Sequence, residues 1–240
     1  MSFFIDLNAD LGEGCGQDER LLPLVTSASV ATGAHAGDDS TAIATMMLAR
    51  RHGVVVGAHP GYADRENFGR KPMEMTASEV EKLVFYQCEH LRRLASAVGV
   101  FLPYLKPHGA LYNQAVVQQA VTLGVVRAAK RLGMALLMQN TVMVPHVAAA
   151  QGVKVVREGF LDRRYNDDGT LVPRSRPDAI LTDDEEIREQ MIRLVETGSV
   201  DSLCIHGDSL HAIALARNVH EWAEDLGWEV RSVWQRVDSR

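Results

Sequence analysis

Short apolar runs alternate with longer amphipathic segments along nearly the whole chain, and this alternation limits the fold more than any other feature. Seven such runs occur, at residues 3–7, 28–32, 54–58, 100–105, 135–138, 153–156 and 202–205. Short runs with β-branched residues are typical of strands, and the spacing of apolar residues between them is typical of helices. Strands that alternate with helices run parallel in one sheet. The chain is therefore predicted to be an α/β protein with a seven-stranded parallel sheet.

Helix starts are marked by capping residues. Thr76 and Glu79 form a capping-box pattern in front of a long amphipathic stretch, and Thr182 with Glu185 repeats that pattern further along the chain. The last apolar segment, residues 230–234, fits either an eighth strand or a closing tail. The sequence leaves both alternatives open.

No linker, repeat or shift in composition divides the 240 residues, so a single domain over residues 1–240 is predicted. The net charge of -6, with Lys and Arg scattered, argues against a nucleic-acid or anionic-membrane binder. The three cysteines have no metal-type or redox-type spacing, and no run approaches about 18 uninterrupted apolar residues. We expect a cytoplasmic protein whose partners are small molecules or other proteins.

Four histidines share one position in the pattern, because each follows an apolar run and has a glycine within two residues. They are His35, His59, His108 and His206. The carboxyl ends of parallel strands meet at one edge of a sheet, where barrels and doubly wound sheets place their active sites. A lone histidine at a strand end is more often structural than catalytic, but four at the same edge favour an active site.

Other polar residues are expected at the same edge. The first run contributes Asn8 and Asp10, the fourth Lys106, the sixth Glu158, Asp162, Arg163 and Arg164, and the seventh Asp208. Two long irregular segments follow strand ends, at residues 59–75 and 162–179, and the first contains Arg70. Ordered loops of this length are usually lids or binding loops, so both are expected to take part in function.

Three kinds of chemistry suit this set of residues. Asp10, His35 and His59 could ligate a divalent metal that activates water, although no local spacing such as H-x-H is present. Alternatively, Asp10 or a histidine could act as general base while Lys106 stabilises an oxyanion or binds a phosphate. Nucleophilic catalysis by Cys15 is disfavoured, because no base is evident beside it. The usual nucleotide-binding glycine motifs are absent from the sequence.

Several segments of the chain resemble the LamB/YcsF family. They are DLNADLGEG (6–14), HAGDD (35–39), GAHPGYADRENFGR (57–70), KPHGALYN (106–113), EGFLDRRY (158–165), DGTLVPRS (168–175) and CIHGDS (204–209). They stand in the family's order and span most of the chain. So many separate motifs make a chance likeness improbable.

This resemblance implies a seven-stranded (β/α) TIM-like barrel similar to the glycoside hydrolase/deacetylase superfamily. It also implies a reaction, the ATP-dependent hydrolytic opening of the 5-oxo-L-proline lactam to L-glutamate. The implied ligands are 5-oxo-L-proline and ATP, whose site could lie on a partner, and the implied partners are two further subunits, B and C. Two alternatives stay open: a metal-dependent carbohydrate deacetylase, and a non-catalytic subunit that binds a small acid.

With that reaction in view, each rim residue is given an expected role. Asp10 activates water, His35 and His59 orient it or hold a metal, and Lys106 and His108 neutralise the developing oxyanion. The residues expected to bind substrate or phosphate are Asn8, Arg70, Arg163, Arg164, His206 and Asp208.

Overall fold

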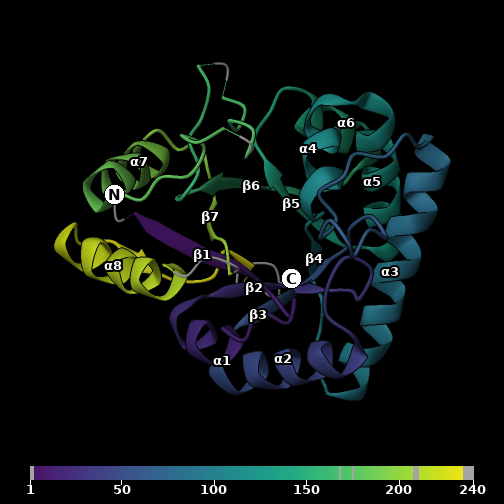
Figure 1. Ribbon diagram of the computed structural model, residues 1–240, viewed down its shortest axis with the longest axis horizontal. Coiled ribbons are helices and arrows are strands. Elements are labelled where there is room, and N and C mark those ends of the chain that lie inside the picture. The colour runs from purple at the N-terminus through teal and green to yellow at the C-terminus, as the bar shows by residue number, and fades with distance from the viewer. Residues whose placement is uncertain (1–2, 168, 175, 208–210, 235–240) are drawn as a thin grey trace.

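Seven parallel strands surround a central axis in the computed structural model, which describes residues 3–167, 169–174, 176–207 and 211–234 (Figure 1). The strands are β1 (Phe4–Leu11), β2 (Ser27–Ala31), β3 (Val55–His59), β4 (Tyr104–Leu105), β5 (Ala135–Gln139), β6 (Val155–Phe160) and β7 (Ser202–Ile205). Each strand pairs in parallel with the next, and β7 and β2 both pair with β1. The sheet therefore closes into the predicted seven-stranded barrel.

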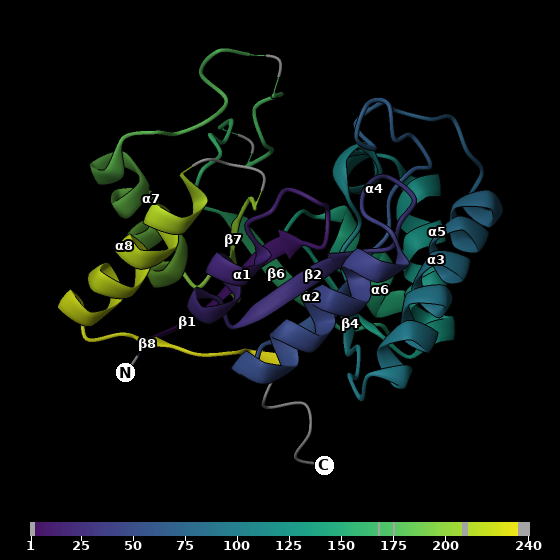
Figure 2. The same ribbon diagram turned by 60° about the horizontal axis from the view of Figure 1, so that its bottom comes forward.

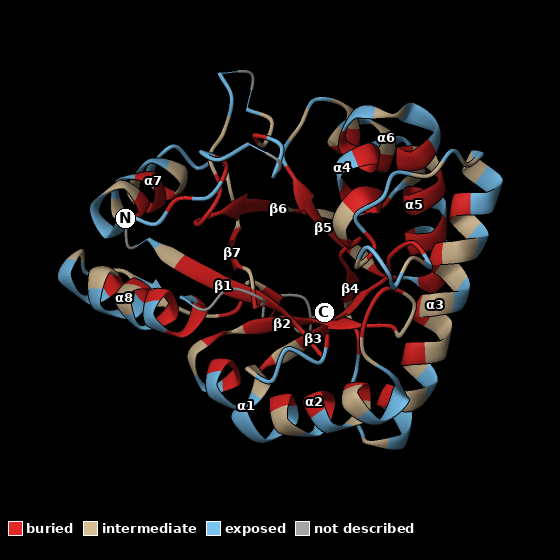
Figure 3. Ribbon diagram, viewed as in Figure 1, coloured by how far each residue is buried: buried red, intermediate tan, exposed pale blue. Residues whose placement is uncertain are grey.

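Helices cover the outside of this barrel, as Figure 1 shows. They are α1 (Asp18–Leu21), the 3-10 helix η1 (Leu22–Leu24), α2 (Asp39–His52), α3 (Ala77–Ala97), α4 (Gly109–Val117), α5 (Gln119–Leu132), α6 (Met143–Gln151), α7 (Asp184–Glu196) and α8 (Ala212–Asp225). Figure 3 shows buried residues on the strands and on the helix faces turned toward them, while the outer helix faces are exposed. The apolar core therefore lies between the strands and the helices.

The strand positions follow the sequence prediction, with two informative differences. β4 keeps only two of its six predicted residues, because the neighbouring Pro103 and Pro107 have no N–H group to donate to a ladder. β1 extends four residues further than predicted, through Asn8 and Asp10. A search for apolar runs misses this part of β1, because it contains polar residues.

Of the two predicted capping boxes, the first is confirmed and the second is wrong. Thr76 caps α3, and both of its reciprocal hydrogen bonds with Glu79 are present. At α7 the capping residue is Asp183, whose carboxylate accepts the N–H of Glu186 at 2.9 Å. An aspartate one position later provides the same type of acceptor, so the helix begins there instead.

Residues 229–234 cover the barrel at the amino-terminal ends of its strands, and they form a short strand followed by a tail. Two residues form β8 (Glu229–Val230), which pairs in parallel with Phe4 and Ile5. Beyond them Trp234 is 2% exposed, and its ring stacks on Tyr104 with centroids 4.2 Å apart. Figure 2 shows this terminal segment running beneath the strands.

At the opposite end of the barrel two long loops rise on the same side (Figure 2). One connects β3 to α3 and the other connects β6 to α7. The second loop has internal structure, because Arg163 forms an antiparallel bridge with Ile180 and Tyr165 forms one with Leu171. Among the helices in the described residues, none has the length and apolar character needed to span a membrane.

Replacing Trp234 with alanine is expected to lower the free energy of unfolding by about 3–5 kcal/mol, because it removes a large buried ring and leaves a cavity beneath Tyr104. Urea denaturation monitored by circular dichroism measures this change. Phe101→Ala is the matched control, because Phe101 is 73% exposed and its loss should change the value by less than about 0.5 kcal/mol. Equal effects of the two substitutions would show that the tail does not contribute to stability.

Candidate active site

The four glycine-flanked histidines lie at the carboxyl ends of their strands. His59 is the last residue of β3, His206 directly follows β7, and His35 and His108 stand in the short connections after β2 and β4. The glycines allow close packing here: a Cβ on Gly207 would lie 2.3 Å from the Asp10 carbonyl oxygen. On Gly61 it would lie 2.7 Å from Nδ1 of His35. Only glycine fits against these neighbours without displacing them.

Alternate residues of β1 turn their side chains into the barrel, as the two-residue period of a strand requires. Asp6, Asn8 and Asp10 are 0%, 0% and 8% exposed, and all three contact polar groups of other strands. Asn8 donates to the hydroxyl of Ser202 at 2.8 Å and accepts from Lys106 at 3.3 Å. Asn8 therefore lies beneath the rim as a support for Lys106.

Lys106 is a buried cation held by two carboxylates. Its Nζ lies 2.8 Å from Oδ1 of Asp10 and 2.6 Å from Oε1 of Glu158, and its side chain is 2% exposed. Burial alone would lower the pKa of Lys106, but the nearby charges, with Asp10 foremost, raise it well above its usual value. Lys106 is therefore protonated at neutral pH.

Asp10 is likewise fixed in its charged form. Burial favours the neutral acid, but His59, Lys106 and His206 outweigh that effect and lower the pKa of Asp10 to about 2. Its second oxygen, Oδ2, lies 3.5 Å from Nε2 of His59. The rim thus carries a permanent negative charge beside a permanent positive one.

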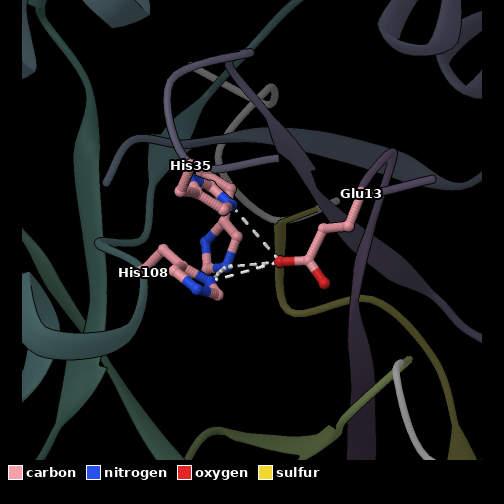
Figure 4. A group of neighbouring side chains, drawn as sticks. Glu13, His35 and His108 are labelled. Carbon is pink, nitrogen blue, oxygen red and sulfur yellow. Dashed lines mark hydrogen bonds and ion pairs between the residues drawn. The ribbon is translucent and has the colours of Figure 1, made fainter. Parts of the chain in front are cut away.

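A group of three histidines surrounds one carboxylate oxygen, Oε1 of Glu13. It lies 3.2 Å from Nδ1 of His108, 3.3 Å from Nε2 of His35 and 3.8 Å from Nε2 of His59. Figure 4 shows the Glu13 carboxylate directed at the rings of His35 and His108, which stack with centroids 3.8 Å apart. All four side chains are buried.

The outer hydrogen bonds of two of these rings fix where their lone pairs point. His59 donates from Nδ1 to the carbonyl oxygen of Lys106, and His108 donates from Nε2 to that of Phe68, each at 2.8 Å. A carbonyl oxygen can only accept, so in the neutral rings Nε2 of His59 and Nδ1 of His108 carry lone pairs. These two atoms are 3.0 Å apart and both face Glu13.

Such a convergence of acceptors calls for a proton or a cation between them. Burial lowers the pKa of His59 to about 3, which disfavours the proton. The ligand atoms of Glu13, His35, His59 and His108 all lie within 4.8 Å of one another. A zinc ion with four tetrahedral bonds of about 2.0–2.1 Å needs donor atoms about 3.3 Å apart. Four of the six separations between these donor atoms are 3.0–3.8 Å, and the other two are within 4.8 Å. The group therefore fits a divalent metal ion.

The fourth histidine, His206, pairs with an acid on the other side of the rim. Nδ1 of His206 lies 2.8 Å and 3.0 Å from the two oxygens of Asp162. Burial raises the pKa of Asp162, but His206 reverses that effect and lowers it below its usual value. The ionised carboxylate accepts the Nδ1 proton, so Nε2 of His206 is the nitrogen left to exchange protons with a ligand.

The rim residues open into a cavity of about 650 Å³, a volume typical of small-molecule sites. Among its lining residues are Asp10, His59, Lys106, His108 and His206, with Arg70, Arg163 and Arg174 from the two long loops. His35 and Glu13 do not line the cavity, and His35 contacts the lining residues His59 and His108 through its ring.

Three of the predicted site residues lie elsewhere or cannot be placed. Asn8 lies below the cavity, as described above. Arg164 is outside the lining, and its side chain, 41% exposed, forms an ion pair with Glu186 at 2.8 Å. Asp208 lies outside the described residues.

Two residues at the site were not anticipated from the sequence. Glu13 stands between two glycines in the loop after β1, three positions past Asp10, and this position was the only signal of its role. Arg174 lies in the predicted functional loop, but nothing in the sequence separates it from the other arginines there. Both depend on how loops fold back over the rim.

Replacing Lys106 with methionine is expected to lower the free energy of unfolding by about 3–5 kcal/mol, because it leaves two buried carboxylates without a cation. Urea denaturation of Lys106→Met and of the double variant Lys106→Met/Glu158→Gln measures this. The double variant is expected to regain part of the lost stability, since one of the two carboxylates without a cation is replaced by a neutral amide. A double variant that is no more stable than the single one would contradict the assigned charge balance.

Comparison with known proteins agrees with the resemblance found in the motifs. A model of the LamB/YcsF family matches residues 5–238. Proteins named as the A subunit of 5-oxoprolinase, from Neisseria meningitidis and Methylococcus capsulatus, are 42% and 43% identical to this chain, over 231 and 238 residues. The two matches cover 90% and 91% of this chain and 94% and 92% of those relatives.

Solved structures agree with the fold. A lactam utilization protein from Thermus thermophilus is 37% identical, with a TM-score of 0.87 over 95% of this chain and 98% of that one. The catalytic domain of a peptidoglycan N-acetylglucosamine deacetylase from Eubacterium rectale has a TM-score of 0.56 at 12% identity, covering 97% of this chain and 89% of that one. The predicted likeness to deacetylase barrels is thus confirmed for the fold. With the family model matching nearly its whole length, this chain belongs to the LamB/YcsF family.

Proposed function

We propose that this chain acts as the A subunit of an ATP-dependent 5-oxoprolinase, which opens the lactam ring of 5-oxo-L-proline to give L-glutamate. Support comes from relatives of that name at 42–43% identity over most of the chain. The function expected from the sequence is thus supported by homology. The observation that carries the proposal is the buried Asp10–Lys106 pair, set beside histidines in a cavity of small-molecule size.

The chemistry of the reaction suits this arrangement. A lactam carbonyl is a poor electrophile, and phosphorylation of its oxygen by ATP makes the ring carbon easier to attack by water. Water then adds to the ring carbon and loses a proton, and the ring C–N bond breaks as the nitrogen takes up a proton, which leaves an acyl phosphate. A second water releases inorganic phosphate and glutamate. Negative charge develops on the oxygen atoms of the reacting carbon, and the leaving nitrogen needs a proton. A fixed cation, a fixed anion and a proton-exchanging imidazole meet these needs.

Each need is assigned to a residue of the rim. The charge of Lys106 stabilises the developing oxyanion, and Asp10 accepts a hydrogen bond from the attacking water. His108, expected from the sequence to share the role of Lys106, has no free N–H group for it, because its Nε2 donates to the carbonyl oxygen of Phe68 and its Nδ1 faces Glu13. Because its pKa of about 2 makes Asp10 a weak base at neutral pH, proton transfer is assigned to His206. The Asp162 carboxylate orients that imidazole, as its hydrogen bonds of 2.8 Å and 3.0 Å indicate.

ATP and two further subunits, B and C, complete the proposed enzyme. The relatives are named as one subunit of a larger 5-oxoprolinase, which supports a partner-dependent activity. The chain is accordingly expected to release glutamate efficiently only when its partners are present.

A divalent metal ion is the proposed cofactor, held by Glu13, His35, His59 and His108. The converging lone pairs and the donor separations of 3.0–3.8 Å support this set. Imidazole and carboxylate ligands suit zinc and neighbouring transition metals. When bound, such an ion would supply Lewis-acid polarisation at the edge of the cavity.

The function is tested by glutamate release from 5-oxo-L-proline and ATP, with this chain mixed with subunits B and C. Asp10→Asn is expected to lower turnover at least about 100-fold through misplaced water, and His206→Gln at least about 100-fold through lost proton transfer. His146→Gln, at an exposed residue outside the cavity, should retain activity. Circular dichroism checks that each variant is folded.

Two outcomes would overturn the proposed function. ATP-independent removal of acetyl groups from amino sugars would favour the deacetylase alternative. Binding of 5-oxo-L-proline without turnover, even with both partners present, would favour a non-catalytic small-acid-binding subunit.

Metal binding is tested without any activity measurement. The purified chain is expected to bind one Zn²⁺ or Co²⁺ per molecule in isothermal titration, and Glu13→Gln or His59→Gln should weaken that binding at least about tenfold. His90→Gln is the control, because the side chain of His90 is 45% exposed and forms its ion pair with Asp39, away from the cluster. Unchanged affinity in both cluster variants would exclude this ligand set.

A further inference from the structure

The cavity lining carries an excess of positive charge. Among its described residues are four cationic side chains, Arg70, Lys106, Arg163 and Arg174, and one carboxylate, Asp10. Lys106 is balanced by its ion pairs with Asp10 and Glu158. Three guanidinium groups, all from the two long loops, therefore line the space where a ligand would lie.

Arg163 is the most unusual of the three because it is buried. It is 5% exposed, and its one hydrogen bond through the guanidinium runs from Nη2 to the carbonyl oxygen of Val172 at 2.6 Å. Nε has no partner. Within the residues that the structure describes, no carboxylate lies within ion-pair distance of it, and the adjacent Asp162 is engaged by His206. The Asp162 carboxylate supplies opposite charge nearby, but its oxygens accept from His206, so Nε–H of Arg163 is left as a buried donor that an anion in the cavity could accept.

A second arginine, Arg174, lies near Arg163. Burial is the main cause that lowers the pKa of Arg163 to about 10, and the nearby positive charge of Arg174 adds to it. Both positive charges also act on the buried carboxylate of Asp162 and help to lower its pKa. The paired N–H groups of arginine match the two oxygens of a ligand carboxylate in the same way.

Arg163 is also held firmly in place by the main chain around it. Nε2 of the buried Gln190 lies 2.8–3.0 Å from the carbonyl oxygens of Phe160, Leu161 and Arg163 itself. The bridge between Arg163 and Ile180 fixes the same segment from the other side. A binding group positioned before the ligand arrives loses little entropy on binding, which favours affinity.

We infer that Arg163 and Arg174 form a subsite for the ring carboxylate of the substrate, so that this cavity selects cyclic amides carrying an adjacent carboxylate over uncharged lactams. The inference rests on the proposed function and specifies how the substrate is recognised. If the substrate carboxylate binds under the β6–α7 loop, the amide of the same substrate can contact the rim residues of the cavity. Arg70, from the other loop, lines the same cavity where a second anionic group such as phosphate would lie.

Substrate selection is tested in the complete complex with Arg163→Met, Arg163→Lys and Arg174→Met. A hydrogen bond to a charged group contributes about 1.5–3 kcal/mol, so KM for 5-oxo-L-proline should rise about 10-fold to 100-fold in Arg163→Met. Arg174→Met should raise KM about tenfold, and Arg163→Lys should restore part of the loss. Arg176→Met is the control, since Arg176 is exposed in the same loop and pairs with Asp178, and its KM should stay within about twofold.

A neutral ligand distinguishes recognition from a structural effect. The uncharged ring 2-pyrrolidinone should inhibit the wild-type and Arg163→Met complexes equally, because it has no carboxylate to lose. Equal weakening of both ligands, or an unchanged KM for 5-oxo-L-proline in both methionine variants, would overturn the inference.

Binding to the isolated chain separates this inference from the proposed function. Titration with 5-oxo-L-proline should give a heat signal that Arg174→Met weakens about tenfold and Arg176→Met leaves unchanged. If the complex shows no turnover but this pattern holds, the proposed function fails and the carboxylate subsite stands. If turnover is normal but neither arginine variant changes binding, the subsite is refuted and the function stands.

Discussion

The buried ammonium group of Lys106 joins the barrel interior to the site at its rim. It meets Asp10 from β1 and Glu158 from β6, with Cys204 of β7 at 3.1 Å and Asn8 at 3.3 Å. Side chains from three strands, β1, β6 and β7, therefore converge on one charge. Burying an ion is unfavourable unless its partners are well placed, so the strand ends must keep this register for the interior to be stable. The same constraint presents Asp10, ionised and immobile, to the cavity above.

Around this centre the rim divides into two kinds of chemistry. On one side, the hydrogen bonds of His59 and His108 to main-chain carbonyls aim their remaining nitrogens at Glu13, which suits a cation. On the other side, Asp162 holds His206 in the form that exchanges protons at Nε2. In both cases an outer hydrogen bond decides what the inner nitrogen can do. The proposed lactam opening would use both functions, one to stabilise charge and the other to move a proton.

The two long loops add three arginine side chains to the cavity above the rim. The β6–α7 loop is fastened by Gln190 and by two short antiparallel bridges, so its arginines are held in place over the cavity. The β3–α3 loop reaches the same space through Arg70. Because the strands fix the reactive groups independently of these loops, loop changes could alter substrate choice while the rim chemistry is kept.

The sequence by itself determined the seven strands, their parallel direction and the edge at which His35, His59, His108 and His206 meet, because apolar periodicity and strand ends are local properties. It suggested Asp10 as the carboxylate beside His35 and His59 and did not identify Glu13, since the loop that turns Glu13 inward is shaped by distant neighbours. Nor could it separate Arg163 from Arg164. Successive residues of an extended segment face opposite sides, and only the bridge to Ile180 decides which side covers the cavity. Tertiary pairing therefore decided which of two adjacent arginines lies in the site.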